Sequence, residues 1–193
     1  MSLNFMFWNV RGIANAPTQN VLKRMIKNYN VGFLAIMEPL TAPDPARYSK
    51  ALGLAFKGSN TTGKIWVFVE EGADFVVEED ADQILHGRFT SPRLANHIAI
   101  SAVYAKCSRP ERFSLWDKMR ELSHTLDGSS WMIGGDFNTI LSPRDRSGSD
   151  TNRQTEMVDF AETIEDCRLL DPGFDGSSYT WAKNGLFESW IEH

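Results

Sequence analysis

The sequence has few cysteines, no long apolar run and no basic leader. Its 193 residues include two cysteines, Cys107 and Cys167, which are too far apart for a zinc-binding spacing or a disulfide framework. We expect two reduced, partly buried thiols in an intracellular protein that is not secreted. No stretch approaches the ~20 apolar residues that a bilayer-spanning helix needs, so no membrane partner is expected.

Basic residues are not in excess either. The net charge is −5 and the sequence pI is about 5.4. Proteins that bind nucleic acid through a broad basic face are usually basic, so the charge disfavours that mode of binding. A local phosphate site that uses a metal ion remains open, because the cation supplies the positive charge.

Several common catalytic motifs are also absent from the sequence. None of the four histidines stands in an HExxH or another paired spacing, and there is no P-loop and no GxGxxG. No nucleophilic triad is apparent. The chemistry must therefore come from other residues.

Alternation and apolar runs predict a mixed protein of strands and helices. Strands are predicted at residues 3–10, 31–37, 64–69, 74–78, 83–89, 97–104, 131–134, 178–181 and 187–191. The apolar run at 31–37 predicts a strand covered on both faces. Helices are expected after Thr18 as a cap, after a capping box of Ser108 and Glu111, and after one of Thr151 and Gln154.

Helix–strand segments at both ends, with a run of short strands between them, predict an α/β (α+β) fold. We expect two packed, mostly antiparallel sheets with helices on their outer faces, in a single domain over residues 1–193. The polar stretch 142–152 is predicted to be a surface loop within this domain.

Polar side chains follow three of the predicted core strands. Asn9 follows FMFW, Glu38 follows VGFLAIM, and Asp136 with Asn138 follows WMIGG. Two carboxylates and two carboxamides at strand ends can converge on one hard cation, and Mg²⁺ prefers such oxygen ligands. Tyr104, at the end of another strand, can donate to a phosphate oxygen.

Each candidate residue also has a purely structural interpretation. Asn9 and Asp136 can be turn residues, and Glu38 can be a solvated loop carboxylate. Tyr104 can pack with its hydroxyl at the rim of the core. The set carries more weight than any single member.

Taken together, the motifs resemble the endonuclease/exonuclease/phosphatase superfamily. WNVRGI, MEP, VYA, GGDFNTIL and SYTW occur in the order found in that superfamily and cover essentially the whole chain. Their wording is most similar to the endonucleases of plant LINE-type (non-LTR) retrotransposons. The resemblance implies a four-layer α/β sandwich and a nuclear or cytoplasmic location.

The resemblance implies a role for each matching residue. Glu38 is the principal metal ligand, and Asn9 helps to form the metal and phosphate site. Asp136 orients or deprotonates the attacking water, Asn138 hydrogen-bonds the phosphate, and Tyr104 contacts the scissile phosphate. The implied cofactor is Mg²⁺, for which Mn²⁺ can substitute, and the implied partner is nucleic acid, with DNA as the first choice.

Two further residues are assigned to nucleic-acid contacts. Arg11 stands where the family often has an acid and the plant-type sequences commonly have arginine. Trp181, in SYTWAKNG, can stack on a base, although core packing is its alternative.

The chain departs from the family at its C-terminal end. Family members continue with a strand bearing a catalytic aspartate and end in Ser-Asp-His, whereas this sequence ends in SWIEH, so no role is carried onto His193. We therefore expect a C-terminally truncated domain that lacks its last strands, has reduced or lost activity and can form a homodimer through an open sheet edge.

The function implied is that of a Mg²⁺-dependent phosphodiesterase, a retrotransposon-derived DNA endonuclease that makes single-strand nicks. An alternative is a domesticated or decayed fragment that binds nucleic acid or a protein partner and catalyses nothing. A phosphatase acting on a small phosphorylated substrate is a third possibility, which the LINE-like motifs disfavour.

Overall fold

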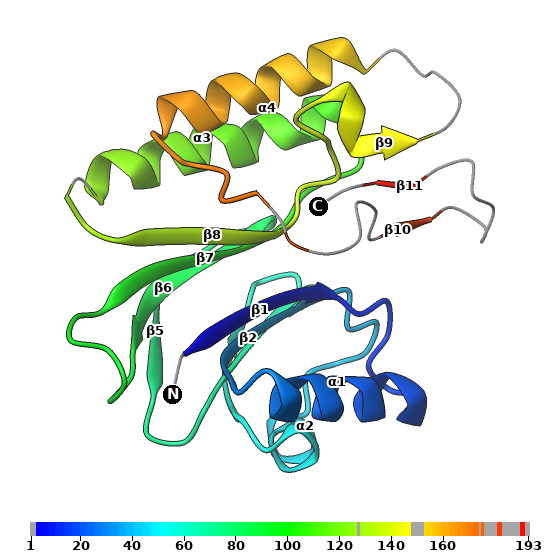
Figure 1. Cartoon of the computed structure of the whole chain (residues 1–193), viewed down its shortest axis with the longest axis vertical. Helices are drawn as coiled ribbons and strands as arrows, with labels where there is room; N and C mark the ends of the chain where they lie inside the picture. Colours follow the sequence, from blue (N-terminus) through cyan, green and yellow to red (C-terminus); the bar gives the residue numbers. More distant parts are fainter. Residues whose placement is uncertain are drawn as a thin grey trace. The chain divides into compact units, whose positions relative to one another are not determined.

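The computed structural model describes residues 3–126, 128–147, 153–173, 175, 181–182 and 190–191 (Figure 1). They fall into two compact units. The first comprises Met1–Ala105 and Gly128–Asp136, and the second comprises Lys106–Asp127 and Phe137–His193. The single domain inferred from the sequence stays a prediction. None of the helices in the described ranges has the length and apolarity needed to cross a bilayer.

The first unit contains strands β1–β8 and helices α1 and α2. In chain order these are β1 (Asn4–Asn9), α1 (Ala16–Asn28), β2 (Val31–Met37), α2 (Pro45–Leu52), β3 (Ala55–Ser59), β4 (Ile65–Val69), β5 (Asp74–Asp80), β6 (Ile84–Thr90), β7 (Ile98–Tyr104) and β8 (Trp131–Asp136).

These strands form two four-stranded sheets, with the orders β1-β2-β4-β3 and β5-β6-β7-β8. Each sheet is mostly antiparallel, as the sequence predicts, but each also contains one parallel pair. The parallel pairs are β1 with β2 and β7 with β8. Parallel neighbours end at the same edge of a sheet, and this property positions the site described below.

The two sheets pack face to face around an apolar core. Rings contribute much of it: Phe33 of the first sheet lies 5.5 Å, centroid to centroid, from both Phe75 and Phe89 of the second. The opposite face of the first sheet is covered by α1 and α2, through Leu22, Tyr48 and other residues. Strand β2 is therefore buried along its whole length, which confirms the prediction of a strand covered on both faces.

Two local features differ from the sequence prediction. Helix α1 begins at Ala16 rather than after Thr18, because the Asn15 side chain accepts the hydrogen bond from the Thr18 N–H at 2.8 Å and caps the helix. The sequence analysis also missed α2 and β3. Helix α2 carries recognisable signals, since Asp44 caps it and Gly53 ends it in a left-handed conformation.

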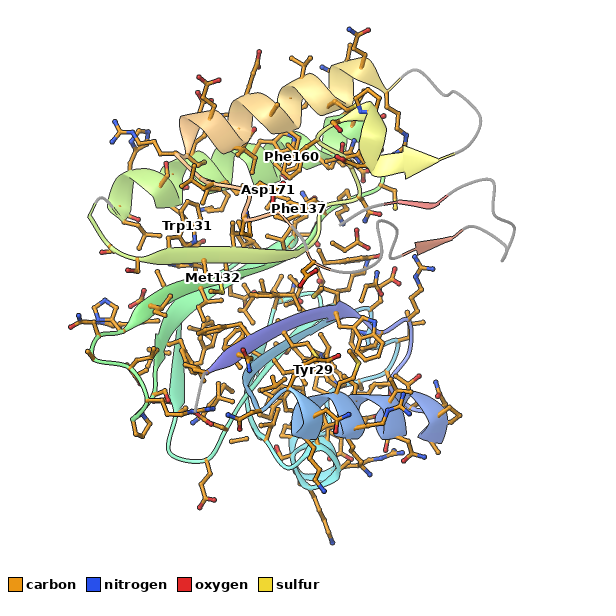
Figure 2. The ribbon with its side chains drawn as sticks, viewed as in Figure 1. Tyr29, Trp131, Met132, Phe137, Phe160 and Asp171 are labelled. Carbon is orange, nitrogen blue, oxygen red and sulfur yellow. The ribbon has the colours of Figure 1, made fainter. Side chains whose placement is uncertain are left out.

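A buried polar row crosses the second sheet on the face opposite the apolar core. His86 is only 2% exposed, and its Nδ1 lies 2.8 Å from Oγ of Ser101, which also accepts a 2.9 Å hydrogen bond from the Trp131 indole. Figure 2 shows Trp131 and Met132 on opposite sides of β8. Burial lowers the pKa of His86, and nearby Glu78 and Glu79 oppose this only in part.

We expect this histidine to make the protein less stable in mild acid. The folded chain keeps His86 neutral, so as the pH falls below about 6.5 the unfolded chain binds a proton that the folded chain does not. The free energy of unfolding should then decrease by up to about 1.4 kcal/mol per pH unit until the lowered pKa is reached. Urea unfolding from about pH 7.5 to 5.5 measures this slope. The His86→Gln variant should lose this part of the slope, whereas replacing the exposed His97 by glutamine should keep it; equal slopes in both variants would contradict the assignment.

The second unit is built on two helices, α3 (Arg109–Thr125) and α4 (Gln154–Asp166). Their contact is aromatic: Phe160 lies 5.1 Å from Trp116 and 4.9 Å from Phe137, and Figure 2 labels Phe137 and Phe160 as neighbours. Arg109 forms an ion pair with Asp159 across the same contact. This partly exposed ion pair links α3 to α4.

The remaining elements of the second unit are short. They are the 3₁₀ turn η1 (Pro143–Asp145), β9 (Arg146–Ser147), β10 (Trp181–Ala182) and β11 (Trp190–Ile191). The three strands form an antiparallel sheet in the order β10-β11-β9. Strands β10 and β11 overlap the regions where the last two strands were predicted, whereas η1 and β9 lie within residues 142–152, which the sequence predicted to be a surface loop.

Two cap predictions and the state of the thiols can be compared with the structure of this unit. Ser108 does precede α3, but its hydroxyl donates to the Glu111 carboxylate and caps no backbone N–H. Thr151, predicted to cap α4, lies outside the described residues. Cys107 is exposed rather than partly buried, and Cys167 is buried, which raises its pKa.

Candidate functional site

The candidate site lies where the two parallel strand pairs of the first unit end. Asn9 is the last residue of β1 and pairs with Met37, the last residue of β2, so Glu38 follows directly beside it. In the other sheet, Tyr104 ends β7 and pairs with Asp136, which ends β8. Each sheet therefore supplies two polar residues at its own edge.

Two hydrogen bonds join these residues across the space between the sheets. The Asn9 side-chain amide donates to the Asp136 carboxylate at 2.8 Å, and the Tyr104 hydroxyl donates to the Glu38 carboxylate. Four residues that are widely separated in sequence thus form one polar cluster. The two bonds orient the carboxylates of Asp136 and Glu38 at the edge of an apolar core. A charged group there interacts more strongly with a bound ion than it would in water, because the local dielectric constant is lower.

Glu38 adopts a backbone conformation that residues other than glycine rarely take, with φ +52°. Its neighbours hold it there: the Glu38 N–H donates to the Lys64 carbonyl at 3.0 Å, and the Glu38 carbonyl accepts from Gly12 at 2.8 Å. Such conformations persist where the surroundings fix them, and they are frequent at functional sites. The side chain is 26% exposed, so it is not the fully solvated carboxylate of the structural alternative.

Asn9 combines the structural and the functional interpretations. Its side-chain oxygen accepts a 3.2 Å hydrogen bond from the Arg11 N–H, which is an Asx turn, while its amide nitrogen donates to Asp136. Arg11 also has a positive φ, +45°, and its Nε lies 4.0 Å from a Glu38 carboxylate oxygen. The turn therefore places a guanidinium beside the Glu38 carboxylate.

The two glycines before Asp136 allow β8 to approach its neighbours closely. A Cβ on Gly134 would lie 2.7 Å from the Phe7 ring, and one on Gly135 would lie 2.0 Å from the Val103 carbonyl oxygen. Gly135 also has φ +140°, which L-residues rarely adopt. Asp136 is thus presented from a strand and is not a turn residue.

Asn138 belongs to the second unit, so it is described separately. It has φ +49°, and its carbonyl accepts a 3.1 Å hydrogen bond from the guanidinium of Arg112. Arg112 is 1% exposed, also donates to the carbonyls of Lys106 and Cys107, and is paired with the Glu156 carboxylate. A buried arginine therefore fixes the loop that carries Asn138.

The sequence analysis did not select Lys64, a cation near the cluster. Its prediction for the Trp181 side chain cannot be compared with the structure. Lys64, in the turn before β4, places its ammonium 5.6 Å from the ring centroid of Tyr104. A lysine after glycine in a polar turn gives no sequence signal that separates it from a solvated residue. Trp181 lies in β10, but its side chain is outside the described part of the chain.

The chemistry of the donors in the first-unit cluster is suited to a hard cation. Glu38 and Asp136 supply carboxylate oxygens and Asn9 a carboxamide oxygen. Among the residues that the structure describes, no three or more acidic, histidine or cysteine side chains are grouped so that they could hold a metal ion together. Mg²⁺ does not require one, because it keeps several waters and is bound by one or two carboxylates. The residues present therefore fit this ion.

Comparison with known proteins identifies the fold. No protein-family model and no curated protein sequence matches the chain. Among solved structures, the endonuclease domain of TRAS1, a telomere-specific non-LTR retrotransposon, has a TM-score of 0.68 at 14% identity, covering 97% of this chain and 80% of that chain. AP endonuclease LMAP from Leishmania major has a TM-score of 0.62 at 18% identity, covering 84% and 66%.

An endonuclease/exonuclease/phosphatase family protein from Bacteroides thetaiotaomicron is also similar, with a TM-score of 0.52 at 15% identity, covering 70% of this chain and 62% of that chain. At these identities the likeness concerns the fold. The chain has the α+β sandwich fold of these proteins, as the sequence resemblance implied; the described residues include two mixed four-stranded sheets and four α-helices. The plant source and the truncation stay predictions.

Proposed function

We propose that the protein is a Mg²⁺-dependent phosphodiesterase that nicks DNA. The observation that carries the proposal is the polar cluster of Asn9, Glu38, Tyr104 and Asp136, joined by two hydrogen bonds at the ends of parallel strands. The fold supports it, since the similar structures include a retrotransposon endonuclease domain and an AP endonuclease.

In this proposal Glu38 and Asn9 hold the ion. Glu38 is suited to this role because its backbone is fixed on both sides and its carboxylate is oriented by Tyr104. Bound Mg²⁺ would neutralise charge on the phosphate oxygens and assist departure of the leaving oxygen. Arg11, beside Glu38, would contact the nucleic-acid backbone.

Asp136 would act on the attacking water. Its carboxylate is held by the Asn9 amide at 2.8 Å, so it is oriented before the substrate binds. It would accept a proton as the water oxygen bonds to phosphorus and one ester P–O bond breaks. Asn138 would donate a hydrogen bond to a phosphate oxygen, where charge accumulates in the transition state. The single hydroxyl proton of Tyr104 is donated to Glu38 in the free protein, and on substrate binding it would be donated to a phosphate oxygen instead, while the ion holds the Glu38 carboxylate.

Nicking of supercoiled plasmid tests the proposal directly. We expect relaxed circles to accumulate in the presence of Mg²⁺ or Mn²⁺ and not in EDTA. A simple phosphate monoester, incubated in parallel, should release no phosphate. Sedimentation of the same sample reports whether the active species is a monomer or a homodimer.

Two outcomes would contradict the proposal. A folded protein that leaves plasmid intact with either ion would support the alternative of a non-catalytic binding domain. Release of phosphate from the monoester with intact plasmid would instead indicate a phosphatase.

A further inference from the structure

The turn between β3 and β4 places Lys64 beside the polar cluster. Its ammonium lies over the ring of Tyr104, whose hydroxyl donates to Glu38. The roles proposed above do not use this cation. In a chain with net charge −5, a lysine over the tyrosine of this cluster requires a separate explanation.

The turn that carries Lys64 is fixed by a buried side chain. Asn60 is 2% exposed, and its side-chain oxygen accepts hydrogen bonds from the N–H groups of Lys64 and Ile65, both at 2.9 Å. Its amide nitrogen donates to the carbonyls of Ala81 and Asp82, at 3.1 and 2.9 Å. The turn is thereby attached to the β5–β6 connection, and its backbone has little freedom to move.

The backbone of Lys64 is also bonded to the cluster itself. Its carbonyl accepts the hydrogen bond from the Glu38 N–H at 3.0 Å, the contact that helps to hold Glu38 at positive φ. One residue therefore positions the carboxylate through its main chain and presents a positive charge through its side chain.

The ammonium group is exposed and faces a ring rather than an acid. Among the described residues, no carboxylate lies within ion-pair distance of its Nζ, whereas Lys57 on the neighbouring strand is paired with Asp74 at 2.8 Å. A lysine acts as a point charge with three donors and is a common phosphate ligand. Because its backbone is fixed, the reach of this charge is limited to the surroundings of Tyr104.

We propose that Lys64 binds a backbone phosphate of the DNA strand at this site. The inference rests on the proposed function for the choice of ligand, and it adds a residue that the sequence analysis did not select. It assigns Lys64 to substrate binding and leaves the bond-breaking step to the cluster.

The salt dependence of DNA binding tests the proposal independently of cleavage. Anisotropy of a short fluorescein-labelled DNA duplex, measured in EDTA from about 50 to 200 mM NaCl, gives the slope of log affinity against log salt concentration. We expect Lys64→Met to make this slope less negative by about 0.9, the value for one lost phosphate contact, and Lys64→Arg to retain it. The control is Lys23→Met, which removes an exposed lysine from α1 and should leave the slope unchanged.

The outcomes separate this proposal from the proposed function. If the wild type does not nick plasmid but the slope changes only in Lys64→Met, the phosphate contact stands and the catalytic proposal fails. If Lys64→Met and the wild type have equal slopes, or the wild type does not bind the duplex, the Lys64 proposal is wrong whether or not plasmid is nicked. Where nicking occurs, Lys64→Met should raise KM and leave kcat nearly unchanged.

Discussion

Asp136→Asn is expected to reduce the rate of plasmid nicking by about 10²- to 10⁴-fold, the usual contribution of a general base. The substitution keeps the size and shape of the side chain. It removes the charge and the proton-accepting capacity of the carboxylate, while the new amide can still accept the hydrogen bond from Asn9 with its oxygen. The loss should therefore appear in kcat, with the fold intact.

The measurement is initial nicking rate at saturating Mg²⁺, with urea unfolding as the check on stability. Asp117→Asn is a suitable control, because Asp117 is an exposed aspartate of α3 and its substitution should leave both quantities unchanged. Nicking by Asp136→Asn at the wild-type rate would exclude Asp136 as the base.

Gly135→Ala is expected to lower the free energy of unfolding by about 3 kcal/mol or more. The added methyl would lie 2.0 Å from the carbonyl oxygen of Val103, which belongs to the backbone of the neighbouring strand and cannot move aside as a side chain can. Alanine would also have to adopt φ +140°. The strand must then shift, and Asp136 with it.

Gly53→Ala provides a control that separates the two causes. Gly53 also has a positive φ, +69°, but a Cβ there would meet no atom within 4 Å, so only conformational strain remains. Its expected cost is about 1 kcal/mol. Urea unfolding of both variants measures the difference, and equal costs would show that the contact with Val103 relaxes freely.

The sequence predicted that the polar residues lie at the ends of strands, but strand periodicity did not predict which of them contact one another across the two sheets. Apolar runs ending in Asn9, Glu38 and Asp136 placed each residue at a strand end, and the structure has them there. The bond between Asn9 and Asp136 joins different sheets, and the side-chain periodicity of a strand contains no information about the partner sheet. The family resemblance, rather than the periodicity, predicted that these residues form one site.

Other misses have local causes. Helix α2 is short and buries only Tyr48 and Leu52, so the sequence contains too few apolar residues at helical spacing to predict it. Its capping residues, Asp44 and Gly53, could have been recognised in the sequence. At α1, Thr18 competes with Asn15 as a cap. Pro17 decides the outcome, because proline fits the first turn of a helix, where its missing N–H costs nothing.

The aromatic layer between the sheets sets the width of the candidate site. Phe33 contacts Phe5 and Phe7 of its own sheet and Phe75 and Phe89 of the other, so the sizes of these rings fix how far apart the two sheet edges stand. The bonds from Asn9 and Tyr104 span that separation and tolerate little change in length. For the proposed enzyme, a core substitution that leaves the chain folded but changes the size of one of these rings is therefore expected to change the nicking rate without touching the substrate.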